Sequence, residues 1–219
     1  TTLPHTKVYQ FIVEAAYDAD TSIFRSSTGF TGLKDYFGND VNISETHPDI
    51  IQILPPTFAG KPGEYIDEHR NPYKLRVLPN GNAYPLDEND GRIRLRVIDV
   101  KLASEPGAHY FAEVVYYSIT LAAWIEEHGL ADQYVVVAAP AIWPGSHEAS
   151  NLAKQNQDWK KKGYSPTPED ISVFLEEDLE IATFDVFGPR LRRLLVEELP
   201  VLLAKPWQQL AWHVDFRCK

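Results

Sequence analysis

Residues 92–101 constrain the fold more than any other segment, because their side chains divide into two alternating sets. One set is Ile93, Leu95, Val97, Asp99 and Lys101, and the other is Arg92, Arg94, Arg96, Ile98 and Val100. Successive side chains of a β-strand leave opposite faces, so this alternation predicts a strand. The first set is apolar at three positions and ends in the Asp99 carboxylate and the Lys101 ammonium, roughly 6.6 Å apart on one face. Ordinary solvated ion pairs at strand ends have the same spacing, so these two residues alone define no site.

Two flanking segments add polar groups to this arrangement. Residues 47–54 alternate as a second strand, in which Asp49 shares a face with two isoleucines. Residues 112–125 have apolar side chains at helical spacing, with Glu113 and Tyr117 on one helix face. The order along the chain is therefore an acid on a strand, Asp-x-Lys on a strand, and a helix with Glu-x-x-x-Tyr.

This order resembles the PD-(D/E)xK nuclease superfamily, and within it the RecB-like branch, over about residues 45–140. The resemblance implies an α/β fold with a restriction-endonuclease-like core, in which helices flank a mixed sheet in the order α-β-β-β-α-β. It implies a nuclease-like core over residues 1–145 and a helical C-terminal extension over residues 146–219. If the sequence is part of a longer chain, this extension would continue past Lys219. The RecB-like branch usually has a Gln where this chain has Glu113, which leaves the role of that position open.

The same resemblance implies a metal-dependent nuclease that hydrolyses the phosphodiester bonds of DNA, with RNA left open. Asp49, Asp99 and the Val100 carbonyl would bind Mg²⁺ or Mn²⁺, since hard cations prefer oxygen ligands. Lys101 would orient or help deprotonate the attacking water and offset charge in the transition state. Glu113 would extend the metal shell through water, and Tyr117 would bind substrate or hold the Lys101 strand. The expected setting is cytoplasmic, in DNA repair or in defence against foreign DNA.

Other functions stay open on the residues alone. A RecB-like module without activity could serve as a nucleic-acid-binding or scaffold part of a larger assembly, and the formal charge of −10 and Glu113 both fit that role. A plain amphipathic helix packed on a sheet would explain Glu113 and Tyr117 equally well. A hydrolase with a Ser or Cys nucleophile has little support, because no Gly-x-Ser-x-Gly occurs.

The charge distribution and composition limit the partners. A net charge of −10 argues against a surface coated with nucleic acid, although a local basic stripe could still bind it. Three sets of basic residues are either such stripes or solvated surface: Arg92, Arg94 and Arg96; Lys160, Lys161 and Lys162; Arg190, Arg192 and Arg193. No run of 18 apolar residues is present, so no membrane partner is expected.

The single cysteine, Cys218, fits a reducing compartment. The sequence begins at Thr1 and contains no Met, which suggests part of a larger polypeptide. RecB-like relatives often carry a cysteine cluster near this place that binds an iron–sulfur cluster. One cysteine cannot supply four thiolates, so such a cluster would require the chain to continue past Lys219.

Several further segments carry local predictions. Residues 7–17 are apolar and suit either a strand or a helix, with Glu14 as an additional acid by resemblance. Residues 55–90 form a long irregular insert that contains a short strand at 73–78 before a turn at Asn80-Gly81. His47 and His69 are possible metal ligands, although lone histidines are more commonly surface residues.

The last third of the chain contains one strand and further helices. The helix after residue 112 is predicted to end at Gly129, and residues 133–142 are predicted to form one continuous strand buried on both faces. Thr167-Pro168 is a typical helix start. Residues 170–204 are predicted to be mostly helical, with a break near Gly188-Pro189.

Overall fold

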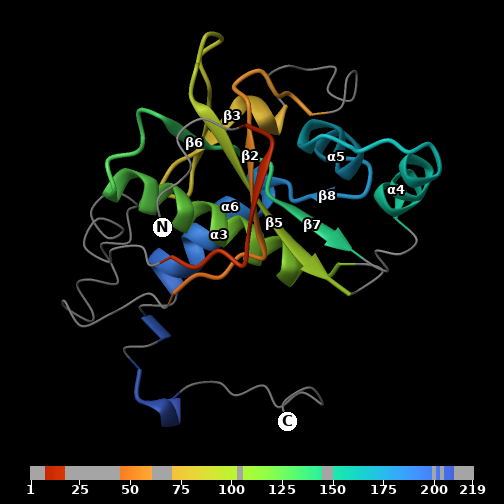
Figure 1. The fold of residues 1–219 in the computed structure, drawn as a ribbon. Coiled ribbons are helices and arrows are strands. Elements are labelled where there is room, and N and C mark those ends of the chain that lie inside the picture. The colour runs from red at the N-terminus through yellow and green to blue at the C-terminus, as the bar shows by residue number, and fades with distance from the viewer. Residues whose placement is uncertain are drawn as a thin grey trace.

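The computed structural model describes residues 8–17, 45–60, 71–102, 106–144, 150–198, 201–202 and 205–209. Its main element is a six-stranded mixed sheet with helices around it, as predicted (Figure 1). The strands of this sheet are β1 (Gln10–Val13), β2 (Ile50–Leu54), β5 (Ile93–Lys101), β6 (Tyr134–Val136), β7 (Ala141–Pro144) and β8 (Glu180–Ile181). A separate hairpin consists of β3 (Leu75–Val77) and β4 (Ala83–Pro85).

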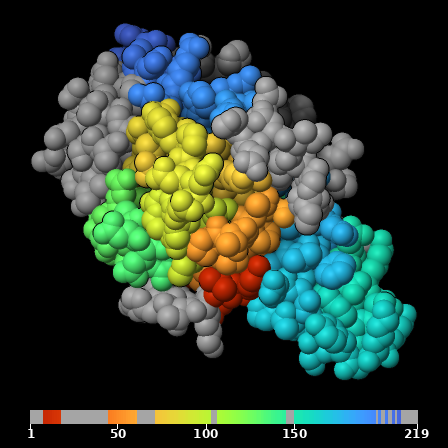
Figure 2. Space-filling view, turned by 90° about the horizontal axis from the view of Figure 1, so that it is seen from above, coloured from red at the N-terminus to blue at the C-terminus, as the bar shows by residue number. Residues whose placement is uncertain are grey.

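The helices are α3 (Ala108–Glu127), α4 (Asn151–Lys161), α5 (Pro168–Leu175) and α6 (Phe184–Arg193). The shorter turns are η2 (Pro72–Lys74), η4 (Leu194–Glu198) and η5 (Trp207–Gln209). Figure 2 shows the region of α4 and α5, in cyan, as a lobe beside the centre of the molecule. No helix within the described residues is both long and apolar enough to span a membrane.

Strand β5 lies at the centre of the sheet, which confirms the predicted strand. It pairs antiparallel with β2 and parallel with β6 and β7. On one face, Leu95 and Val97 pack in the main core with buried residues of α3. On the other face, Ile98 packs against Leu175 of α5. Both faces of β5 are therefore covered by other elements.

The prediction of one continuous strand over residues 133–142 is wrong, although residues 134–142 are buried as expected. It forms β6 and β7, with a break at residues 137–140. Pro140 has no N–H for a ladder hydrogen bond, and the Ala138 N–H donates to the Leu75 carbonyl of the hairpin at 2.9 Å. The segment leaves the β5 ladder for part of its length because its backbone is bonded to β3 instead.

The predicted break near Gly188-Pro189 is also wrong, because α6 continues through both residues. Gly188 permits close packing: a side-chain carbon there would lie 2.8 Å from the Phe184 ring and 3.1 Å from the Gly81 carbonyl oxygen. The helical region is interrupted earlier, at residues 176–183, where β8 joins the sheet next to β7. Gly188, which can interrupt a helix, instead permits close packing of α6 here.

The remaining local predictions mostly hold. Residues 7–17 contain strand β1, and the expected first helix does not occur within residues 8–17. The turn at Asn80-Gly81 connects β3 to β4, with Gly81 in the left-handed region (φ 77°). Gly129 adopts the same conformation (φ 66°) after the end of α3. Thr167 caps α5 through a reciprocal bond with Asp170.

Candidate active site

Asp49 and Asp99 meet across the β2–β5 ladder. Ile50 lies opposite Ile98, so one further step along the antiparallel register places Asp49 opposite Asp99. The Asp49 carboxylate oxygen Oδ2 accepts a hydrogen bond from the Val100 N–H at 2.7 Å. This bond fixes the Asp49 side chain against β5, beside the Asp99 carboxyl.

Lys101 connects the strand to α3. Its Nζ lies 2.5 Å from Asp99 Oδ2 and 3.1 Å from Glu113 Oε2. The Tyr117 hydroxyl donates to Glu113 Oε1 at 2.9 Å, which orients that carboxylate toward the strand. The structure thus brings together all five predicted side chains, through one continuous set of polar contacts.

The electrostatics of the site centre on Asp99, whose residue surface is only 3% exposed. Burial, together with the neighbouring Asp49 carboxyl, raises its pKa from 3.8 to about 6, although Lys101 acts in the opposite direction. Burial alone would lower the pKa of Lys101, but its bonds with Asp99 and Glu113 outweigh burial and raise that pKa. Lys101 therefore stays protonated. Its single positive charge only partly compensates the facing carboxyl groups of Asp49 and Asp99.

The donor set suits a small divalent cation held by two carboxylates. Asp49 and Asp99 supply the one or two protein carboxylates that Mg²⁺ typically uses, and Val100 lies beside them in β5. A cation there would relieve the burial and repulsion that raise the pKa of Asp99. In the described part of the chain, no group of three or more His, Cys, Asp or Glu side chains could hold a metal ion. Glu113 stands beyond the Lys101 ammonium and is bonded to it.

The other predicted candidates lie apart from this centre or outside the described residues. Glu14 donates its backbone N–H to the Asp49 carbonyl at 2.8 Å, but its side chain is exposed. His47 is exposed, with Nε2 3.1 Å from a Glu45 carboxylate oxygen. His69 and Cys218 lie outside the described residues.

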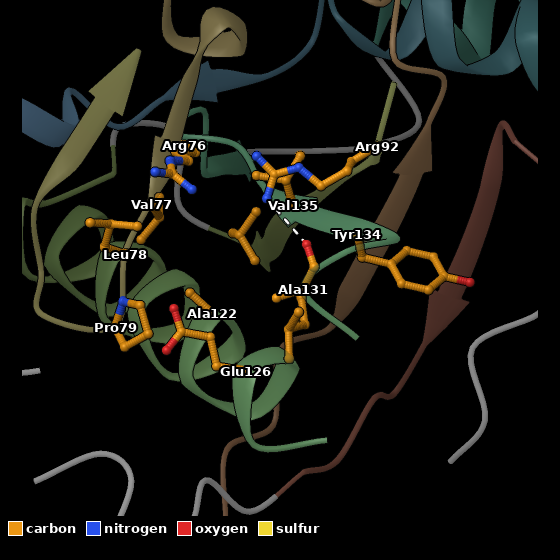
Figure 3. Close-up of a pocket in the computed structure, with 12 residues that line it drawn as sticks. Arg76, Val77, Leu78, Pro79, Arg92, Ala122, Glu126, Ala131, Tyr134 and Val135 are labelled. Carbon is orange, nitrogen blue, oxygen red and sulfur yellow. Dashed lines mark hydrogen bonds between the residues drawn. The ribbon is translucent and has the colours of Figure 1, made fainter. Parts of the chain in front are cut away.

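The arginine face of β5 contradicts its prediction as solvated or nucleic-acid-binding surface. Arg94 and Arg96 are buried, at 8% and 0% exposure. Arg92 is half-buried, with Nη2 2.6 Å from Asp90, and it donates to the Ala131 carbonyl beside a small recess (Figure 3). By contrast, Lys160–Lys162 on α4 and just after it, and the three arginines of α6, are exposed.

Two aromatic residues near the site were missed by the sequence reasoning. The Lys101 ammonium lies 4.9 Å from the centre of the Tyr110 ring, and the His109 ring lies 3.9 Å from that ring. Tyr110 precedes Glu113 by three residues, so helical periodicity places both on one face of α3. That spacing was the available signal.

Comparison with known proteins gives no match, whether with family models, curated proteins or solved structures.

Proposed function

We propose that the chain is a metal-dependent nuclease of the restriction-endonuclease-like, RecB-like type, which hydrolyses phosphodiester bonds of DNA with Mg²⁺ or Mn²⁺. The observation that carries the proposal is the meeting of two strand-borne carboxyls, Asp49 and Asp99, beside the Lys101 ammonium. An acid pair with an adjacent cation on one sheet edge suits the increase of negative charge during phosphodiester cleavage.

Each side chain has a distinct task in this proposal. Asp49 and Asp99 would hold the divalent cation, which when bound supplies charge neutralisation and an activated water. Lys101, kept protonated by its two carboxylate partners, offsets charge on the phosphate and orients water. Its raised pKa makes it unsuited to remove a proton. Glu113 positions Lys101, and Tyr117 positions Glu113.

A second candidate is a non-catalytic RecB-like module that binds nucleic acid or acts as a scaffold. Its support is the position of Lys101, which bonds to both Asp99 and Glu113 and partly neutralises the acids that would bind a metal. The formal charge of −10 also fits a role without extensive nucleic-acid contact.

Cleavage and metal binding separate the two candidates. We expect Asp99→Ala and Lys101→Ala each to abolish Mg²⁺- or Mn²⁺-dependent cleavage of single- and double-stranded DNA while unfolding remains cooperative. Asp132→Asn and Lys154→Ala, at exposed positions away from the site, serve as charge-matched controls. Calorimetry should show metal binding that Asp49→Asn weakens. Wild-type turnover in either active-site variant would refute the assignment, and absence of metal binding would favour the non-catalytic module.

A further inference from the structure

Two buried arginines lie on the same face of β5, and within the described residues only Arg96 has a carboxylate partner. Arg96 is fully buried, with Nη2 2.5 Å and Nη1 3.1 Å from the two carboxylate oxygens of Glu176. Arg94 is 8% exposed, and its Nη1 donates a hydrogen bond to the Phe58 carbonyl. Its Nε is buried without a partner within the described residues. The charge of Arg96 is therefore neutralised by a carboxylate, whereas the described contacts of Arg94 include only a neutral carbonyl.

The acid that attracts Arg94 is already engaged by another arginine. Asp90 attracts Arg94, but both of its carboxylate oxygens accept hydrogen bonds from Arg92, at distances of 2.6 to 3.1 Å. Burial lowers the pKa of Arg94, as expected for a desolvated cation without a counter-ion in contact. A buried charge without a partner is unfavourable, and an anion beside it would relieve that cost.

Arg94 lines a pocket between the β3–β4 hairpin and β5. The pocket has a volume of about 370 Å³. Its other lining residues are Lys74, Leu75, Pro85, Leu86, Asp87 and Glu88. Arg94 is the buried cation of this lining, three residues are apolar, and Asp87 and Glu88 are exposed acids. The pocket combines the Arg94 guanidinium and the Lys74 ammonium with apolar walls and an acidic edge.

We propose that this pocket binds a small organic monocarboxylate whose carboxylate pairs with Arg94. The planar guanidinium matches a carboxylate with two parallel hydrogen bonds, and its Nε makes none within the described residues. Leu75, Pro85 and Leu86 suit a hydrocarbon body. Asp87 and Glu88 disfavour a phosphate dianion or a nucleic-acid strand, because like charges repel across the short span of a pocket.

The site is independent of the proposed nuclease centre. Arg94 belongs to the alternate side-chain set of β5, so it leaves the sheet on the face opposite Asp99 and Lys101. A ligand at Arg94 would therefore lie on the other side of the sheet from the candidate active site. The pocket can be tested whether or not the chain cleaves DNA.

Calorimetry of the intact chain with benzoate and hexanoate tests the proposal, with inorganic phosphate and an oligothymidylate as alternative ligands. We expect saturable benzoate binding that Arg94→Gln weakens roughly tenfold or more, since hydrogen bonds to charged groups contribute that much. Arg190→Gln, at an exposed position of α6 away from the pocket, is the matched control and should bind benzoate as the wild type does. Asp87→Asn should strengthen phosphate binding more than benzoate binding.

A second variant covers the case in which Arg94→Gln fails to fold. Pro85 is exposed and lines the pocket, so Pro85→Glu introduces a carboxylate that competes for Arg94 at a tolerant position. Loss of benzoate binding in this variant supports the proposal. Absence of binding by both carboxylates, unchanged binding in Pro85→Glu, or phosphate or oligothymidylate binding that Arg94→Gln removes would each overturn it.

Discussion

Ionisation of Asp99 should lower the stability of the fold. Its pKa is about 6 in the folded protein against an ordinary 3.8, so the folded state binds this proton more tightly than the unfolded state. The contribution of Asp99 to stability is therefore complete below about pH 3.8 and is lost as the pH rises through about 6. The difference between these two pKa values corresponds to at most about 3 kcal/mol of stability. Screening by solvent near the site brings the expected contribution to roughly 1–3 kcal/mol.

Asp99→Asn isolates this contribution from the other titrating groups. Urea unfolding of the wild type and the variant from pH 4 to pH 7.5 gives the difference in their free energies of unfolding. Near pH 4 most Asp99 carboxyls are neutral in the folded protein, and near pH 7 only the wild type carries the buried charge. As the pH rises over this range, we expect the wild type to lose about 1–3 kcal/mol of unfolding free energy relative to Asp99→Asn. Asp49→Asn should lower the pKa of Asp99 and make this movement smaller.

The opposite trend would refute the reasoning. If the wild type gained stability relative to Asp99→Asn as the pH rose, the Lys101 ion pair would outweigh burial and the Asp49 carboxyl. Repeating the pH 7 measurement with Mg²⁺ tests the proposed ligand set at the same time. A cation bound between Asp49 and Asp99 favours the ionised carboxyl, so added Mg²⁺ should stabilise the wild type and leave Asp99→Asn almost unchanged.

Three further substitutions test the interior and one helix end. Glu176→Ala leaves Arg96 buried without its carboxylate and should reduce the free energy of unfolding by about 3–5 kcal/mol, measured by urea unfolding; a loss below about 1 kcal/mol would show that the pair is not desolvated. Gln52→Leu should raise the thermal midpoint of unfolding, because it removes a buried amide that has no hydrogen-bond partner within the described residues. Burying such an amide costs about 1–3 kcal/mol, and a lower midpoint in the variant would contradict this. Thr167→Ala should cost about 0.5–2 kcal/mol while Thr167→Ser retains the cap of α5, and equal melting of the two variants would count against the capping bond.

The candidate site could be predicted because it depends on local periodicity. Alternation in β5 places Asp99 and Lys101 on one face, and helical spacing places Glu113 and Tyr117 on one face of α3. The meeting of Asp49 with Asp99 needed one further assumption, that the two strands are neighbours, and the structure contains that pairing.

The arginine face shows what local pattern omits. Alternation separates the two faces of a strand but does not show whether the second face meets water or another element. Arg96 is covered because Glu176, 80 residues later, reaches the sheet. The division of residues 133–142 had a signal in Pro140, but the hairpin strand that accepts the Ala138 N–H lies more than 60 residues earlier in the chain. Contacts between distant segments decide both outcomes.

The attachment of the last third of the chain to the central sheet affects how the protein folds during synthesis. The ribosome releases β5 long before Glu176, β8 and α6, which respectively neutralise Arg96, extend the sheet beyond β7 and pack on α3. Until those residues emerge, a nascent chain would hold Arg96 without the Glu176 carboxylate and would have an open sheet edge, both of which disfavour a stable intermediate. Folding of this domain is therefore expected to finish late, once residues up to about 193 have emerged, and a ribosome-bound chain ending near residue 145 should remain protease-sensitive.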